Sequence, residues 1–315
     1  MASLGARNSW LAKIACAFLL LGFSLSLHAA AQQAAKPRPT YANLSYGPHE
    51  RNVLDLWLAK SDKPTPLVLF IHGGGFRGGS KSAIGGATIK RFLDAGISVA
   101  AIEYRFISDK PLPAAHYDCR RALQFLRYNA ERFNIDKEKI GAFGGSAGAQ
   151  LCMWLAFHDD MADPNSDDPI ARESTRLTCV ATTGGQTTMD FEWWKKWIPG
   201  IEDEASRRST TEVLTELFGT DDLETVRKIV EDISALSLIS KDDPPIFMEY
   251  RQRPTDPVPK DPQKARGWKI HHVIFGIKLK EKMDELGIEA VLKYPGVQTP
   301  YESREDFLIK KLSAK

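Results

Sequence analysis

One stretch of the sequence decides the fold: K-I-G-A-F-G-G-S-A-G-A-Q-L-C-M-W-L-A-F, residues 139–157. It begins with the apolar pattern of a buried strand and ends with an apolar run long enough for a helix. Between the two lies G-G-S-A-G, centred on Ser146. A sharp strand-to-helix turn with small flanking residues exposes the serine hydroxyl beside the N–H groups of the helix start. The stretch therefore predicts a nucleophilic Ser146 at the carboxyl end of a strand.

A second glycine run supports this interpretation. The sequence H-G-G-G-F, residues 72–76, directly follows the apolar run at residues 67–71. Glycines at such a strand end let backbone N–H groups approach a carbonyl oxygen closely. We therefore expect the N–H groups of Gly74, Gly75 and Ala147 to form an oxyanion hole.

The rest of the chain alternates strand-like and helix-like segments. Further strands are expected at residues 52–58, 97–102, 179–181, 246–250 and 290–294, and helices at residues 83–93, 114–133, 275–286 and 304–312. This alternation predicts an α/β fold with a mostly parallel eight-stranded sheet and helices on both faces. Residues 52–58 are expected as an antiparallel edge strand. Residues 159–178 and 190–199 are expected to be irregular.

These motifs make the chain resemble the hormone-sensitive-lipase and feruloyl-esterase-like branch of the α/β-hydrolases. Further matches are Glu103-Tyr104-Arg105, Leu112-Pro113-Ala114-Ala115 with Asp118, and Asp242-Asp243-Pro244-Pro245. The resemblance runs from Tyr41 to Leu312. It implies an α/β-hydrolase fold and a serine carboxylesterase that needs no cofactor or metal and acts on a small-molecule ester.

The resemblance also implies an acid and a histidine beside Ser146. The family acid lies past the seventh strand, where Asp256 is the candidate and Asp261 the alternative. The family histidine follows the last strand, yet residues 294–301 read Y-P-G-V-Q-T-P-Y and no histidine follows His272. His271 or His272 is then the substitute base, with His272 favoured. His158 is expected at the far end of the helix that follows Ser146, too distant from the serine to act as its base.

The N-terminus has the pattern of a secretory signal peptide. Arg7 and Lys13 precede an apolar run at residues 14–27, and small residues end at Ala31. We expect a signal peptide at residues 1–31, a leader at 32–40 and one hydrolase domain at 41–315, secreted or periplasmic and without a stable membrane span. Without Arg7 and Lys13, the formal charge of +2 falls to zero, which gives no reason to expect a nucleic-acid partner.

Cysteines and tryptophans give weaker signals. Cys119, Cys152 and Cys179 remain after signal cleavage and are interpreted as small buried hydrophobic residues that allow at most one disulfide. The Trp193, Trp194 and Trp197 cluster is interpreted as packing, with a carbohydrate or aromatic-acyl platform as the alternative.

Three functions fit these residues. The first is a serine-dependent hydrolase of small or carbohydrate-linked acyl esters. Because the expected histidine is missing, the second is a weak or inactive relative that binds a ligand or partner in the inherited pocket. A serine peptidase ranks last, because the chain has no room for an additional large domain. The oligomeric state does not follow from the sequence.

Overall fold

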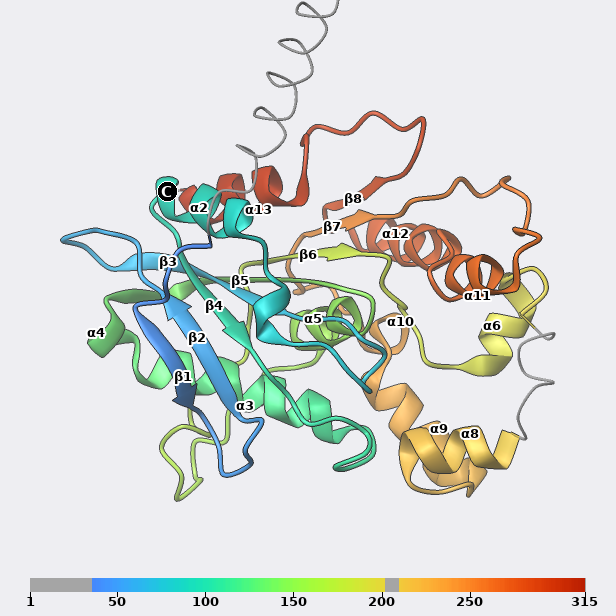
Figure 1. The fold of residues 1–315 in the computed structure, drawn as a ribbon, viewed down its shortest axis with the longest axis horizontal. Helices are drawn as coiled ribbons and strands as arrows, with labels where there is room; N and C mark the ends of the chain where they lie inside the picture. Colours follow the sequence, from blue (N-terminus) through green and yellow to red (C-terminus); the bar gives the residue numbers. More distant parts are fainter. Residues whose placement is uncertain (1–35, 202–209, 315) are drawn as a thin grey trace, which may run out of the picture.

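The computed structural model describes residues 36–201 and 210–314, and eight of its strands form one sheet (Figure 1). The predicted signal peptide therefore lies outside the described residues. The strands are β1 (Tyr41–Ser45), β2 (Val53–Trp57), β3 (Thr65–Ile71), β4 (Ser98–Ile102), β5 (Ile135–Gly145), β6 (Cys179–Thr183), β7 (Ile246–Glu249) and β8 (Ala290–Lys293). Their order is β1-β2-β4-β3-β5-β6-β7-β8.

The sheet is mostly parallel, as predicted. Strands β1 and β2 are antiparallel to their neighbours, and β3 to β8 pair in parallel. β2 is antiparallel as expected, but β1 takes the edge position instead. Because all parallel strands end at one side of the sheet, the loops after β3, β5, β6, β7 and β8 meet there.

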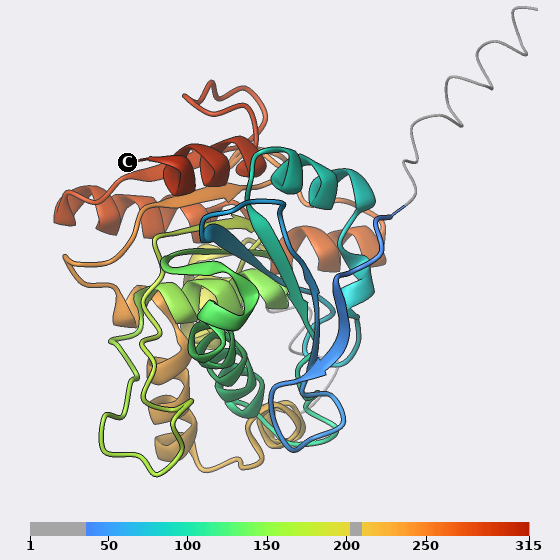
Figure 2. The ribbon, with the colours of Figure 1, turned by 90° about the vertical axis from the view of Figure 1, so that its left-hand side faces the viewer.

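Helices cover both faces of the sheet (Figure 2). They are α2 (Gly86–Asp94), α3 (Ala114–Tyr128), α4 (Ala130–Phe133), α5 (Ala147–Phe157), α6 (Phe191–Trp197), α8 (Thr210–Phe218), α9 (Leu223–Ile233), α10 (Ala235–Leu238), α11 (Pro262–Ile270), α12 (Ile274–Leu286) and α13 (Arg304–Ser313), with a short 3-10 turn at Lys81–Ala83. Helices α2 and α13 pack on one face, and α3, α5, α10 and α12 on the other.

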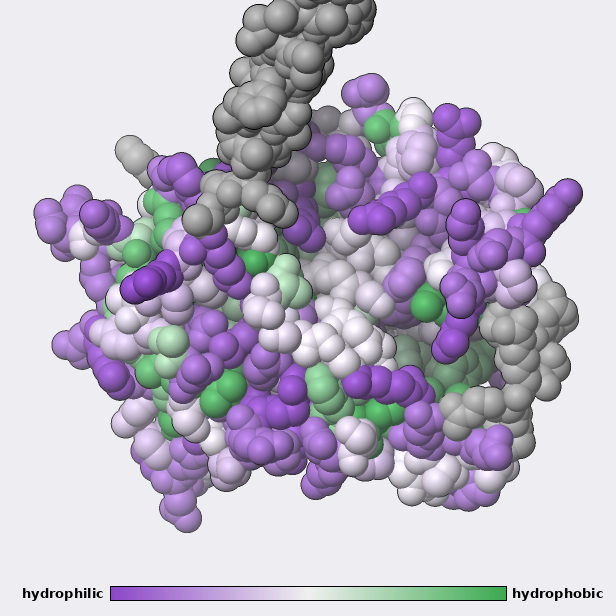
Figure 3. All heavy atoms as spheres, in the orientation of Figure 1, coloured by the Kyte–Doolittle hydropathy of each residue, from purple (hydrophilic) through white to green (hydrophobic). Residues whose placement is uncertain are grey.

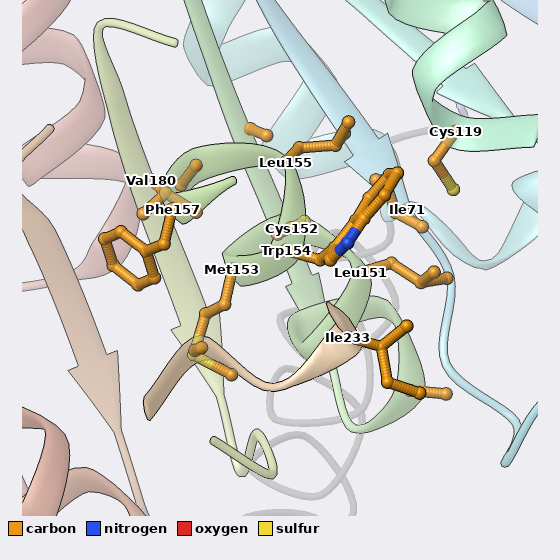
Figure 4. Close-up of a cluster of buried hydrophobic side chains, with 14 of the residues drawn as sticks. Ile71, Cys119, Leu151, Cys152, Met153, Trp154, Leu155, Phe157, Val180 and Ile233 are labelled. Carbon is orange, nitrogen blue, oxygen red and sulfur yellow. The ribbon is translucent and has the colours of Figure 1, made fainter. Parts of the chain in front are cut away.

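Two apolar clusters, one on each face, hold the layers together. Alternate residues of β3 enter them: Leu67 and Leu69 pack toward α5, and Val68 and Phe70 toward α2 and α13. Helix α5 is buried along its whole length, which explains why its sequence is apolar on every side (Figure 4). Burial of apolar surface contributes roughly 25 cal/mol per Å² to stability, so the fully buried α5 contributes strongly to the core.

Several predicted elements need correction. The helix predicted at residues 114–133 is divided at Asn129 into α3 and α4. Residues 190–199 are not irregular, since Asp190 caps α6 by accepting hydrogen bonds from the N–H groups of Glu192 and Trp193. Helices α8 to α11 and strand β1 were not expected. Residues 159–178 contain no helix or strand, as predicted.

The three cysteines of the described chain are buried and free, as interpreted from the sequence. In residues 36–201 and 210–314, we find no helix with the length and apolar character of a membrane span. The face seen in Figure 3 is largely hydrophilic, with small and scattered hydrophobic patches.

Candidate active site

Ser146 occupies the sharp turn between β5 and α5. Its backbone has φ 54° and ψ −124°, a conformation that L-residues rarely adopt. The turn is held on both sides: the Ser146 N–H donates to the Thr183 carbonyl of β6 (3.0 Å), and the Ser146 carbonyl accepts from the Gln150 N–H (3.0 Å). Ser146 itself is only partly buried. This is the strained turn that the sequence predicted for a nucleophilic serine.

Two glycines let the strand ends approach the turn. A Cβ atom on Gly148 would lie 2.6 Å from the His72 carbonyl oxygen, closer than real Cβ atoms come. A Cβ on Gly73 would lie 2.6 Å from the Gly145 carbonyl oxygen and 3.4 Å from the Ser146 Cβ. The glycine run after β3 therefore lies against the serine because both motifs lack side chains at the contact.

Three N–H groups around Ser146 are left without an internal acceptor. Gly74 and Gly75 have positive φ angles, and within the described residues their N–H groups donate no hydrogen bond. Ala147 is the first residue of α5, so its N–H has no intrahelical partner. The structure thus leaves these three predicted oxyanion-hole donors available for a ligand oxygen.

A buried polar network holds the glycine loop, residues 73–75, in place. The His72 ring stacks on Tyr104 at 4.3 Å, its Nδ1 donates to the Gly73 carbonyl, and its Nε2 lies 3.2 Å from the Glu103 carboxylate. Burial raises the pKa of Glu103, but the adjacent His72 ring and the hydrogen bonds from Ser80 and the Lys81 N–H outweigh it and hold that pKa below its usual value. Glu103 thus stays ionised and fixes the loop.

Each of the two predicted acids accepts a hydrogen bond from a nearby backbone N–H. The Asp256 carboxylate accepts from the Arg253 N–H at 2.7 Å within an exposed turn. Asp261 caps α11 by accepting from the Lys264 N–H at 2.8 Å. Neither bonds to a histidine among the described residues, so the role of Asp256 as catalytic acid stays a prediction.

The adjacent histidines have different environments. His272 is buried, its Nδ1 accepts from the Ile274 N–H (3.2 Å), and its Nε2 has no partner among the described residues. Burial lowers the pKa of His272 to about 4. Within those residues no hydrogen bond links His272 to Ser146 or Asp256. The predicted triad is therefore not joined by hydrogen bonds, and the favoured base stays a prediction.

His271 instead lies at the end of β6. Its Nδ1 is 2.8 Å from the Gly184 carbonyl oxygen, and Gly184 directly follows the residue that accepts from the Ser146 N–H. Burial lowers the pKa of His271, although its bond to Gly184 opposes the effect. The sequence could not separate the two histidines, because they are consecutive and the turn between α11 and α12 decides which one faces the sheet edge.

The place of the family histidine holds other residues. In the loop after β8, the Thr299 hydroxyl donates to the Tyr301 carbonyl (2.7 Å). Arg304, at the start of α13, places its guanidinium 3.5 Å from the Thr183 hydroxyl. His158 caps the far end of α5 and contacts Asp232, as its position in the sequence predicted.

The tryptophans pack α6 onto the body of the protein. Trp194 is buried, meets Phe275 of α12 edge-on at 5.3 Å and donates from Nε1 to the Thr188 carbonyl. Trp193 stacks on the same Phe275 at 5.3 Å, and Trp197 lies under the Lys278 ammonium. This supports packing as their role. Over residues 36–201 and 210–314, no three His, Cys, Asp or Glu side chains gather as a metal site would need.

The BD-FAE family model matches residues 54–258, well over half of the chain. Esterase LipC of Mycobacterium tuberculosis is 22% identical over 218 residues, which cover 66% of this chain and 49% of that protein. An arylesterase of Saccharolobus solfataricus is 38% identical over 87 residues, or 27% of this chain and 28% of that one. The chain thus spans about half the length, or less, of these curated relatives.

Solved structures share the fold. A truncated carbohydrate esterase from gut microbiota superposes with a TM-score of 0.66 at 20% identity, covering 90% of this chain and 100% of that one. An acetyl ester-xyloside bifunctional hydrolase from Caldicellulosiruptor lactoaceticus superposes with a TM-score of 0.60 at 20% identity, covering 83% and 87%. At this identity the likeness shows the α/β-hydrolase fold.

Proposed function

The chain belongs to the BD-FAE family, and from that premise we propose that it is a serine-dependent carboxylic ester hydrolase. The observation that carries the proposal is the strained Ser146 beside three N–H groups without internal acceptors. A hydroxyl at such a turn attacks an ester carbonyl, and the N–H groups of Gly74, Gly75 and Ala147 bind the oxygen that becomes negative. Such donors strengthen as charge develops, so they favour the transition state over the bound ester.

We infer that the substrates are small or carbohydrate-linked acyl esters. Two findings support this class: the curated relatives are esterases, and the superposed structures include a carbohydrate esterase and an acetyl ester-xyloside bifunctional hydrolase.

The decisive experiment compares the wild type with Ser146→Ala. We expect turnover of p-nitrophenyl acetate and of acetylated xylo-oligosaccharides by the wild type only. A fluorophosphonate probe should label the wild type at Ser146 and leave the variant unlabelled. Equal rates for the two proteins, with both folded by circular dichroism, would refute the proposal.

A second candidate rests on the missing histidine after β8. The loop after β8 holds no histidine, although the family resemblance places the residue that activates the serine there. An inactive relative that binds a ligand in the inherited pocket would give no Ser146-dependent turnover with any acyl length. It would still bind a carbohydrate ester in isothermal titration calorimetry.

We also propose that the protein is exported, with cleavage near Ala31. The basic residues, apolar run and small residues at positions 7–31 support this location. Cell fractionation followed by N-terminal sequencing of the mature protein tests it, and a cytoplasmic chain that begins at residue 1 would contradict it.

A further inference from the structure

We propose that His271 is the general base for Ser146 and that the backbone carbonyl of Gly184, not a carboxylate, orients it. This inference rests on the ester hydrolysis proposed above. It concerns the residue that both the family pattern and the sequence left unassigned, and it makes the machinery a serine–histidine pair.

Sheet register places Gly184, the hydrogen-bond partner of His271, beside the serine; among the described residues no hydrogen bond joins His271 to Ser146 itself. In the parallel pairing of β5 and β6, Gly145 is opposite Thr183, so the next residues along the two chains are Ser146 and Gly184. Neighbouring strands lie about 4.8 Å apart. The carbonyls of two consecutive residues hold the serine and the histidine. The Thr183 carbonyl accepts from the Ser146 N–H (3.0 Å), and the Gly184 carbonyl accepts from His271 Nδ1 (2.8 Å).

The hydrogen bond to Gly184 sets the tautomer. A carbonyl oxygen only accepts, so His271 must carry its proton on Nδ1 and keep the lone pair on Nε2. That is the tautomer a triad carboxylate imposes on its histidine. The Gln186 amide, 3.2 Å from the same Nδ1, donates to the Ile270 carbonyl and leaves this assignment intact. His272 has the opposite arrangement, because its Nδ1 accepts a hydrogen bond and its Nε2 must hold the proton.

The backbone of His271 is pinned from two strand ends. Gln186, in the loop after β6, donates to the Ile270 carbonyl. Gln252, in the loop after β7, donates to the carbonyls of Trp268 (3.0 Å) and His271 (2.7 Å). Both loops lie at the carboxyl edge of the sheet, where Ser146 also lies. The two glutamines thus fix the imidazole over that edge without an acidic partner.

Ser146, His271, the backbone donors and water account for every bond and proton in the reaction. As Ser146 Oγ bonds to the ester carbonyl carbon, its proton passes to His271 Nε2, and the oxyanion is held by the backbone donors. The intermediate collapses by breaking the carbon–oxygen bond to the alcohol, which takes the proton from Nε2. Water then repeats the two transfers on the acyl-serine, releasing the acid and restoring both side chains.

The test compares three alanine variants with p-nitrophenyl acetate as the substrate. His271→Ala should lower kcat at least about 100-fold while KM stays within about threefold, as expected for a lost general base. His158→Ala, at the far end of α5, is the matched control and should keep the wild-type kcat. His272→Ala tests the competing assignment. Thermal melting of each variant separates lost chemistry from lost folding.

Chemical rescue gives a readout that a purely structural role of His271 would not change. Added imidazole should restore part of the turnover in His271→Ala and nothing in Ser146→Ala. Full activity of His271→Ala, or a loss in His272→Ala that imidazole rescues, would overturn the inference while Ser146-dependent hydrolysis stands. A wild type without Ser146-dependent turnover would overturn both the inference and the function on which it rests.

Discussion

The contacts around Ser146 depend on which glycine positions carry no side chain. Gly148 and Gly145 both flank the turn, yet they differ in the space around them. A Cβ on Gly148 would be 2.6 Å from the His72 carbonyl oxygen, whereas a Cβ on Gly145 would be 3.6 Å from the Thr183 oxygen, an ordinary contact. Of these two glycines, only Gly148 is therefore needed for the approach of β3 to α5.

We predict that Gly148→Ala lowers the free energy of unfolding by about 1–3 kcal/mol, the usual cost of forcing extra volume into a packed site. The extra methyl group also pushes the glycine loop away from Ser146, so turnover should fall. Gly145→Ala is the matched control and should change stability by no more than about 0.5 kcal/mol. Urea unfolding measures both, and equal losses would contradict the argument from close approach.

The charge near His271 leads to a prediction about pH. Burial lowers the pKa of His271, and the nearby positive charge of Arg251 lowers it further. Because the neutral imidazole is the base, a lower pKa keeps the base competent to lower pH. Turnover should therefore fall on acidification only below the ordinary range of histidine.

Arg251→Ala should move that acid limb of kcat/KM to higher pH, since removing a positive charge raises the pKa of its neighbour. The profile should be recorded from pH 4 to 9 in buffers of constant ionic strength. An unchanged limb in Arg251→Ala, or a wild-type limb above the ordinary histidine range, would argue against His271 as the titrating base.

Strands and helices are predicted best where the local sequence pattern decides the structure. Strands β3 and β4 are continuous apolar runs and are buried as expected. Strand β1 is polar and largely exposed, and exists because it pairs with β2 across a turn, which no local pattern reveals. The turn at Ser146 and the glycine loop are likewise local motifs and are therefore predicted from the sequence. The base depends on how α11 and α12 meet β6, which is a long-range arrangement.

Helix α6 forms where the sequence predicts an irregular segment. Its irregular appearance came from a short length and three tryptophans, but Asp190 caps it and Trp194 anchors it. We predict that Trp194→Ala costs about 3–5 kcal/mol of unfolding free energy, as expected for a buried tryptophan. Trp197→Ala, with a partly exposed ring, should cost less. Chemical denaturation of both variants checks this, and an equal cost would contradict the burial argument.

The cysteine thiols test the folding of the chain and the proposed signal cleavage together. Cys119, Cys152 and Cys179 are buried and free, and burial raises the pKa of each thiol. We predict that the native protein, after the proposed cleavage near Ala31, does not react with a thiol reagent, and that three thiols per chain react once urea unfolds it. A reductant should leave the melting temperature unchanged. A fourth equivalent would mean that Cys16 is retained, and fewer than three would reveal a disulfide.

Buried histidines couple the stability of the whole fold to pH. His116 has no exposed surface, bonds to Gln150 (2.9 Å) and contacts the rings of Phe76 and Trp154. Burial lowers its pKa from 6.5 to about 4, and His272 shows the same shift. The unfolded chain therefore binds more protons than the folded chain between pH 6.5 and 4, so stability rises with pH across this window.

We accordingly predict that acidification from pH 7 to pH 4 removes on the order of 3 kcal/mol per buried histidine, because one pKa unit corresponds to about 1.4 kcal/mol. His158 acts in the opposite direction, since its hydrogen bond to Asp232 raises its pKa and adds stability at low pH. The net slope should still be positive, because the pKa values of His116, His271 and His272 are all lowered and only that of His158 is raised. Urea midpoints measured at several pH values should give a flatter dependence for His116→Phe than for the wild type. Parallel curves would show that His116 is not the titrating group and that the coupling lies elsewhere in the core.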